Sequence, residues 1–228
     1  MEPKDFLAFI VNEIHTTVTA TVDDDGLPVT AAIDMMDSDE GGLYFLTAKG
    51  KSFYDRLKKR GFLALTAIRG EDTMRSVAVS VRGRVRELGP ELLPRLFEKN
   101  PYMAEIYPAE ASRTALTVFK LYEGAGEWFD LSKKPIERAQ FTFGGEDPVD
   151  PANPAEDAER ADRTAPDALT ETGYRITDAC VGCGTCLGVC PQQCIDDSDV
   201  PFTIRSENCL RCGNCFELCP AGAVKKGR

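Results

Sequence analysis

A mainly β barrel with a few α-helices, followed by a small α+β domain built around metal, is the architecture that this sequence predicts. Three observations support it. The first 143 residues alternate β-branched runs with few helical patterns, and all nine cysteines lie at or after residue 180. The chain has 228 residues, of which 43% are hydrophobic, so it is long enough for more than one domain with a real core.

The first region, residues 1–143, contains period-2 and helical patterns in alternation. Phe6, Phe9, Ile10 and Ile14 share one helical face, and Asp-Asp-Asp-Gly at 23–26 separates two β-branched runs as in a hairpin. The expected elements, in chain order, are a helix at 5–14, strands at 15–22, 27–36 and 43–47, a helix at 51–61, strands at 62–68 and 76–88, a helix near 90–99, and strands at 114–122 and 126–131. Many antiparallel strands with few helices indicate a small barrel.

The net charge of −10 is concentrated in one segment. Residues 144–173 carry nine Asp/Glu against two Lys/Arg, whereas the regions on either side are close to balance. Four prolines and few large aliphatic residues prevent this segment from forming its own core, so we expect a linker or an arm that lies on another surface. We therefore predict three parts: 1–143, the segment 144–173, and a cysteine-rich domain at 174–228.

Charge and composition also exclude several classes of function. No basic surface dominates, so nucleic acid is not an expected partner. No apolar run of about 18 residues occurs and the N-terminus lacks a signal-peptide pattern, so we expect neither a membrane span nor secretion, and a cytoplasmic location. His15 is the single histidine, which excludes sites built on several histidines, and we expect a structural role for it.

The cysteine-rich region is an internal repeat with a period of 29 residues. The run that begins at Cys180 aligns without gaps on the run that begins at Cys209, and each half reads C-x2-C-x2-C-x3-C-P. Two zinc ribbons would need only C-x2-C pairs and would leave the rest of each run unexplained. Gly184 and Gly213, each after the second cysteine of its run, allow a positive φ and a close backbone approach to sulfur.

This doubled run resembles that of bacterial-type ferredoxins with two [4Fe-4S] clusters, in which the fourth cysteine of each run serves the other cluster. The resemblance implies that one cluster is bound by Cys180, Cys183, Cys186 and Cys219, and the second by Cys209, Cys212, Cys215 and Cys190. A domain of this size is too small to fold comfortably on apolar burial alone, so the clusters would supply much of its core.

Cys194 lies outside both runs. A redox thiol or an alternative ligand is one interpretation. The repeat favours another, because the position 29 residues later is Ala223, which indicates a slot for a small apolar side chain.

The first region resembles the pyridoxamine 5′-phosphate oxidase-like family in three stretches: TATVDDDGLPVTAAIDM, GLYFLTAKGKSFYDRLKK and VSVRGRVREL. The resemblance covers roughly residues 4–143. It implies a split β-barrel that forms a homodimer and binds FMN between the protomers.

The motif T-x-K-x-K-S before a short helix provides candidate phosphate ligands. Thr47, Lys49, Lys51 and Ser52 would bring two ammonium groups and two hydroxyls to a strand end before a helix N-terminus. Helix N-termini attract anions and lysines neutralise phosphate, so together with the resemblance we expect FMN phosphate here. On its own the motif would fit an ordinary solvated turn.

Two further candidates come from the resemblance. Family members often carry an arginine on the second strand near the flavin phosphate, where this chain has Val29, Thr30 and Ala31; we keep Ala31 as a candidate cofactor contact. Trp128 is either a flavin-stacking residue or a buried core residue. No Arg/His-bearing substrate segment follows Trp128, so pyridoxamine phosphate is not the expected substrate.

Two classes of function remain. In the first, the chain is an FMN- and iron–sulfur-dependent oxidoreductase that passes electrons between two [4Fe-4S] clusters and FMN, to or from a small molecule or a redox partner. In the second, it is a non-catalytic electron carrier or redox sensor whose barrel docks a partner or holds another cofactor, such as haem or a deazaflavin. No G-x-G-x-x-G fingerprint supports nicotinamide use.

Overall fold

The computed structural model describes residues 1–145 and 173–227. These separate into two compact units. The first comprises Met1–Gly70, Ala78–Glu127 and the strand residues from Gln140; the second comprises Glu71–Val77, Trp128–Ala139 and the C-terminal part of the chain. Most of the predicted segment 144–173, including all of 146–172, lies outside the described residues.

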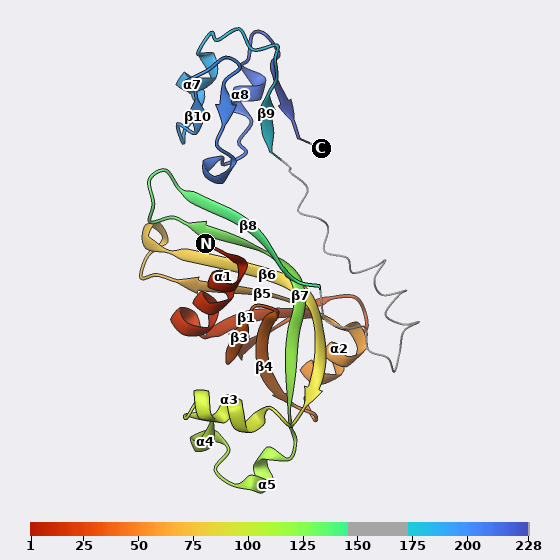
Figure 1. Cartoon of the computed structure of the whole chain (residues 1–228). Helices are drawn as coiled ribbons and strands as arrows, with labels where there is room; N and C mark the ends of the chain where they lie inside the picture. Colours follow the sequence, from red (N-terminus) through yellow and green to blue (C-terminus); the bar gives the residue numbers. More distant parts are fainter. Residues whose placement is uncertain (146–172, 228) are drawn as a thin grey trace. The chain divides into compact units, whose positions relative to one another are not determined.

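A long antiparallel sheet with short helices makes up the N-terminal part (Figure 1). Its elements are α1 Pro3–Phe9, a π-helical turn η1 Ile10–Ile14, β1 Thr16–Val22, β2 Pro28–Asp34, β3 Asp37–Asp39, β4 Gly42–Ala48, α2 Ser52–Arg60, β5 Phe62–Arg69, the 3-10 turn η2 Thr73–Arg75, β6 Val77–Gly89, α3 Leu93–Lys99, α4 Met103–Ile106, α5 Glu110–Arg113, β7 Leu116–Asp130 and β8 Glu137–Gly144. The expectation of a mainly β domain with few helices is confirmed.

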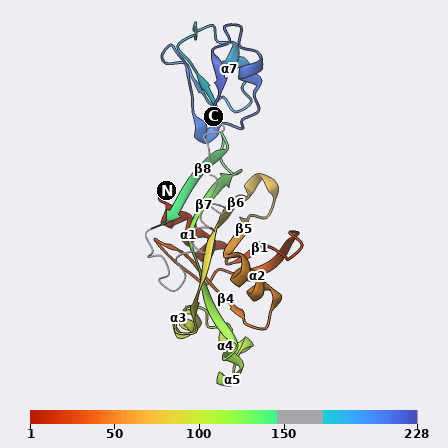
Figure 2. The same ribbon diagram turned by 90° about the vertical axis from the view of Figure 1, so that its right-hand side faces the viewer.

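The strands of the first unit are hydrogen-bonded in the order β2-β1-β5-β6-β7-β4-β3, and β8 also pairs with β7. The interior is apolar: Phe45 lies opposite Phe119 in the β4–β7 register, their rings stack at 5.7 Å between centroids, and both side chains are fully buried. In Figures 1 and 2, α3, α4 and α5 gather at one end of the barrel. Leu93, Leu96 and Met103 cover the sheet residues Tyr44 and Val118 there.

One expectation about the strands is wrong. The runs 114–122 and 126–131 form a single strand, β7, that continues through Gly124 and Gly126. A Cβ at Gly124 would lie 2.5 Å from the Arg82 carbonyl oxygen, and one at Gly126 would lie 2.3 Å from the Phe141 ring. Both glycines therefore serve close packing inside a strand and do not end it.

The helix expected at 5–14 also differs in detail. Its α-helical part ends at Phe9, and the chain continues as the π-helical turn η1. His15 then adopts φ 68° and ψ −67°, which is the left-handed side of backbone space that non-glycine residues seldom occupy. His15 thus joins η1 to β1 through a strained backbone conformation.

Two small sheets hold the C-terminal part together. Its elements are β9 Tyr174–Ile176, α7 Thr185–Val189, β10 Ile195–Asp196, β11 Thr203–Ile204, the 3-10 turn η3 Ser206–Asn208, α8 Asn214–Glu217 and β12 Val224–Lys226. β9 pairs with β12 and β10 pairs with β11, both antiparallel. Among the described residues, no helix is long and apolar enough to span a membrane.

Candidate functional site

The two cysteine runs adopt nearly the same backbone path. Helices α7 and α8 start directly after Gly184 and Gly213, which have φ values of 74° and 86°. The positive φ expected at both glycines is confirmed. Because each of these glycines follows the second cysteine of its run and is the N-cap of the helix, the third cysteine of each run lies in the first turn of that helix.

The 29-residue period also appears in the backbone conformation at two further pairs of positions. Gly182 and Arg211 are 29 positions apart and have φ values of 68° and 56°. Gln193 and Gly222 are related in the same way, with 48° and 58°. Arg211 and Gln193 therefore adopt a left-handed backbone conformation that is unfavourable for residues other than glycine. At the equivalent position of the other half, the residue is a glycine.

Strand pairing crosses between the halves. The strand before the first run, β9, pairs with β12 after the second run, and the strand before the second run, β11, pairs with β10 after the first. This crossing brings the end of each cysteine run next to the beginning of the other.

The result is two cavities, each lined by thiols from both runs. Cys180, Cys183, Cys186 and Cys219 line the first cavity. Cys190, Cys209, Cys212 and Cys215 line the second, together with Cys194. The structure thus brings together the same two sets of four that the ferredoxin resemblance implies, and none of the nine cysteines, all of which lie in the described residues, forms a disulfide.

The fourth cysteine of each run is set up to carry negative charge. Burial tends to raise the pKa of Cys190, but backbone N–H groups of Cys194, Gln192 and Gln193 donate to its sulfur and hold the pKa below the ordinary value. At Cys219, burial is likewise outweighed by backbone N–H groups that include Ala223, whose nitrogen lies 3.3 Å from the sulfur. Amide donors of this kind stabilise a thiolate.

The third cysteines have the opposite environment. Cys186 and Cys215 are buried in the small core of this domain, beside Ile195, Phe202 and Val224. Burial raises the pKa of both thiols, and the neighbouring cysteines act in the same direction. A positively charged partner in each cavity would favour the thiolate form of these sulfurs.

Cys194 is the cavity residue that sequence reasoning did not assign to a site. Its side chain is 2% exposed and Ala223, its counterpart, is 1% exposed, so the small buried slot is present in both halves. Its sulfur also lies 3.5 Å from that of Cys190. Burial raises the pKa of Cys194, and the nearby thiols of Cys190 and Cys209 raise it further.

The candidate phosphate residues lie around the start of α2. Lys51 is the N-cap and is extended, at φ −97° and ψ 139°, and Ser52 is the first helical residue. Lys49 occupies the turn before it, where its backbone N–H donates to the Ala115 carbonyl at 2.9 Å. All three side chains are exposed, so two ammonium groups and a hydroxyl surround a nine-residue helix's N-terminus.

Thr47 does not join this exposed group. It is 4% exposed, faces Thr117 in the β4–β7 register, and its hydroxyl has no hydrogen-bond partner among the described residues. The alternation of β4 turns this side chain inward, which the T-x-K-x-K-S spacing could not indicate.

The other two candidate contacts occupy different places. Ala31 lies in β2 opposite Thr19, whose hydroxyl donates to the Ala31 carbonyl at 2.9 Å, and it is half-buried. Trp128 is 7% exposed, near the end of β7, and belongs to the second compact unit. The structure does not gather Ala31, Trp128 and the lysines into one cluster within the first unit.

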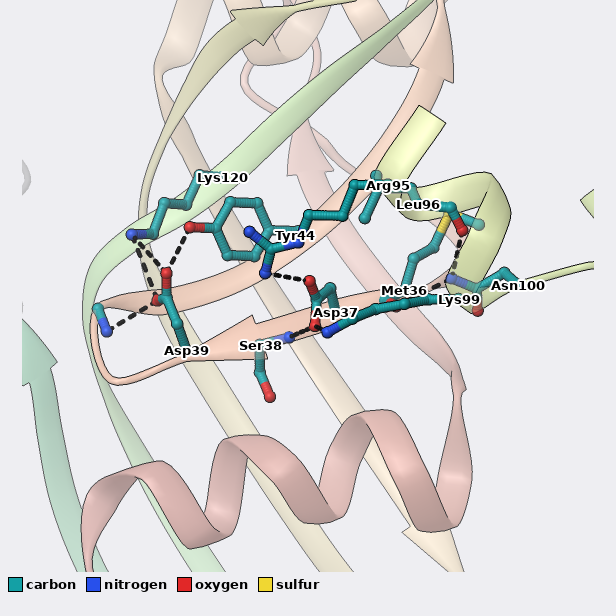
Figure 3. A network of polar contacts seen from close by, with 11 residues as sticks. Met36, Asp37, Ser38, Asp39, Tyr44, Arg95, Leu96, Lys99, Asn100 and Lys120 are labelled. Atoms are coloured by element: carbon teal, nitrogen blue, oxygen red, sulfur yellow. Dashed lines mark hydrogen bonds and ion pairs between the residues drawn. The ribbon is translucent and has the colours of Figure 1, made fainter. Parts of the chain in front are cut away.

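A polar network that the sequence did not predict ties α3 to the sheet (Figure 3). Asp37, which is 4% exposed, forms ion pairs with Arg95 and with Lys99, the latter at 2.5 Å. Beside it, Asp39 accepts a hydrogen bond from Tyr44 at 2.5 Å and pairs with Lys120 at 3.3 Å. Burial would raise the pKa of Asp39, but the Tyr44 hydroxyl and the Lys120 charge hold it below its ordinary value.

Two family models match the chain. The model of the pyridoxamine 5′-phosphate oxidase family matches residues 3–128. The model of the 4Fe-4S dicluster domain matches residues 179–224, which includes all nine cysteines. Comparison with curated proteins yields no match.

Solved structures resemble the N-terminal part. A NimC/NimA family protein from Clostridium acetobutylicum is 15% identical with a TM-score of 0.50, covering 61% of this chain and 91% of its own. PhzG from Burkholderia lata, in complex with tetrahydrophenazine-1-carboxylic acid, is 17% identical (TM-score 0.49; 64% and 89% covered). HutZ, the heme storage protein from Vibrio cholerae, is 14% identical (TM-score 0.43; 64% and 100% covered). Of these three, the first supports the shared fold, a split barrel, and at this identity it supports nothing further.

Proposed function

This chain belongs to the pyridoxamine 5′-phosphate oxidase family, whose model matches more than half of it, and from that premise we propose that it is an iron–sulfur flavoprotein oxidoreductase. It would pass electrons between two [4Fe-4S] clusters and a barrel-bound FMN, to or from a small molecule or a redox partner. The observation that carries the proposal is the pair of cavities, each lined by three thiols of one run and the fourth thiol of the other.

The donor set suits iron–sulfur clusters. In our assignment one cluster is held by Cys180, Cys183, Cys186 and Cys219, and the other by Cys190, Cys209, Cys212 and Cys215. Backbone N–H groups already point at the Cys190 and Cys219 sulfurs, and such donors compensate the charge of cluster-bound thiolates.

The start of α2 suits a phosphate monoester. The first-turn N–H groups of a helix have no intrahelical acceptor, and the helix dipole favours an anion there. Lys49 and Lys51 add two positive charges and Ser52 adds a hydroxyl donor. These residues would hold the FMN phosphate, while Thr47, whose hydroxyl is buried, would not touch it.

When bound, FMN supplies two-electron chemistry and each cluster one-electron chemistry, so that two clusters match one flavin turnover. The residues of this chain would hold the groups and set their charge environment. The barrel residues Ala31 and Trp128 stay candidate flavin contacts from the family resemblance.

We also propose that the barrel forms a homodimer through the outer face of β2, β1, β5 and β6. Val18 and Ile68 are 58% and 62% exposed on this face, and Val22 is 40% exposed. Ala32 lies opposite Val18 in the β1–β2 register, and Ala64 lies opposite Ala20 in the β1–β5 register. The exposed apolar side chains of β1 and β5, together with the neighbouring alanines, would match a second copy of the same face.

The proposal is tested by anaerobic purification with iron, sulfide and flavin counted on the same sample. We expect about eight iron and eight sulfide per chain, and one flavin that carries a phosphate. Cys219→Ala should damage the cluster whose other ligands are Cys180, Cys183 and Cys186 and leave the second intact. A preparation with zinc and no acid-labile sulfide, or with no flavin, would overturn the proposal.

A further inference from the structure

Cys194 shares the second cavity with four candidate cluster ligands. Its sulfur lies 3.5 Å from the Cys190 sulfur, within hydrogen-bond distance for two sulfur atoms, and its side chain is 2% exposed. A buried thiol at this position is out of contact with bulk water, so its S–H group must find its partner inside the cavity.

The 29-residue repeat allows Cys194 to be compared with its counterpart Ala223 in the other half. In both halves a backbone N–H donates to the fourth cysteine of the run: that of Cys194 to Cys190, and that of Ala223 to Cys219. Both side chains fill equivalent buried slots. The difference at this position is therefore one thiol, which the second cavity has and the first lacks.

The direction of the hydrogen bond follows from the chemistry of the ligand. Once Cys190 binds iron its sulfur is a thiolate, which accepts and cannot donate. The hydrogen between the two sulfurs must then come from Cys194. A donor to a cluster-bound sulfur stabilises the more negatively charged, reduced cluster, and hydrogen bonds to the sulfurs are among the factors that set cluster potentials.

We propose that Cys194 is a positioning residue that raises the reduction potential of the cluster held by Cys190, Cys209, Cys212 and Cys215 above that of its pseudo-symmetric neighbour. The two clusters are thereby unequal, and the first electron to enter the domain resides on the second cluster. This inference rests on the proposed function, because it requires that both cavities hold clusters.

The test is an anaerobic redox titration of the full chain, followed by electron paramagnetic resonance, with iron counted on each sample. In Cys194→Ala we expect full iron content and a lower midpoint potential for one cluster. The expected change is roughly tenfold in its reduction equilibrium, or about 59 mV for one electron, with the other cluster unchanged. Cys194→Ser, which keeps a donor, should stay closer to the parent protein.

The matched variant is Ala223→Cys, which places a thiol at the equivalent position of the other half. It should raise the potential of the cluster that Cys194→Ala leaves unchanged. Full iron with unaltered midpoints in Cys194→Ala would overturn the inference and leave the proposed function standing. Loss of iron in Cys194→Ala would also overturn it, by making Cys194 a ligand. Absence of clusters from the parent protein would instead overturn the proposed function.

Discussion

Single charged residues act very differently in this protein according to what surrounds them. Asp37 is nearly fully buried between two cations, whereas Asp24 is 77% exposed in its pair with Lys59. The same carboxylate chemistry therefore contributes to stability at one position and hardly at the other, because solvent screens the exposed pair and side-chain entropy opposes it.

We expect Asp37→Asn to lower the free energy of unfolding by roughly 2 kcal/mol. This is less than a fully buried pair would lose, because the Arg95 and Lys99 side chains are 46% and 50% exposed and can be solvated. Urea unfolding, followed by a probe of the barrel, measures the change. Asp24→Asn is the matched control and should leave the urea midpoint unchanged; equal effects of the two variants would contradict this account of the network.

Lys51 is the residue on which the flavin proposal can be tested most directly. We expect Lys51→Ala to weaken FMN binding roughly tenfold and riboflavin binding little, because FMN alone carries the phosphate that the ammonium group would neutralise. Fluorescence titration of the apoprotein with both ligands gives the two constants.

Lys58→Ala is the control for Lys51→Ala, since it removes a charge at the other end of the same helix, where Lys58 already pairs with Glu87 at 3.0 Å. Equal weakening of FMN and riboflavin by Lys51→Ala would contradict the assignment of the phosphate to the start of α2.

At the scale of elements, the short helices α7 and α8 each depend on one glycine with a left-handed backbone. The two glycines differ in their surroundings. A Cβ at Gly213 would lie 2.8 Å from the Tyr174 hydroxyl, whereas one at Gly184 would lie 3.8 Å from the nearest atom, in Leu187. An alanine at either position would have to adopt a left-handed backbone conformation. At Gly213 its Cβ would also clash with Tyr174.

We therefore expect Gly184→Ala to destabilise the C-terminal domain by about 1–2 kcal/mol, and Gly213→Ala by more. Thermal unfolding of the full chain with its metal bound, together with the iron content, measures both. Tyr174→Phe removes the atom in conflict and should recover part of the Gly213→Ala loss. If the two alanine variants lost the same amount of stability, the close approach of Tyr174 to position 213 would not contribute to the loss.

Elements whose signals are local could be predicted from the sequence. The β1–β2 hairpin follows from β-branched runs around a turn, and α2 follows from its apolar spacing and basic last turn. The cysteine sets followed from the repeat and the ferredoxin resemblance. The π-helical turn η1 and the long strand β7 could not be predicted, because packing against distant residues determines them.

The same limit applies to the candidate site. That Thr47 faces inward depends on the phase of β4 against β7, and the Asp37 network joins residues about 60 positions apart. The contact between the Cys194 and Cys190 sulfurs could not be predicted from the sequence. The repeat indicates a small side chain at position 194, but it does not indicate which residue that side chain contacts.

At the scale of the whole molecule, the proposed homodimer can be tested at the exposed face of the sheet. We expect Ile68→Asp to convert a dimer to a monomer, because a carboxylate placed on a face that pairs with its own copy would be buried without a partner. Sedimentation or light scattering of the full chain reports the mass. Ile106→Asp is the control, since Ile106 is equally exposed, at 59%, but lies in α4, away from that face.

A monomeric parent protein would contradict the dimer proposal outright. A dimer that Ile68→Asp leaves unchanged would place the contact elsewhere on the surface. In either case the metal content of the chain should not change, so the assembly and the clusters are tested separately.

The crossed strand pairing in the C-terminal domain has a consequence for how that domain forms and how it can be altered. Each small sheet takes one strand from before one run and one from after the other, and each cavity takes its thiols in the same crossed way. Neither half is a module that could fold, be deleted or be transplanted by itself. Removing either would leave one cavity with three of its four candidate ligands and the other with one. The domain must therefore assemble in an all-or-none manner, and a lesion in one half will be felt at both metal sites.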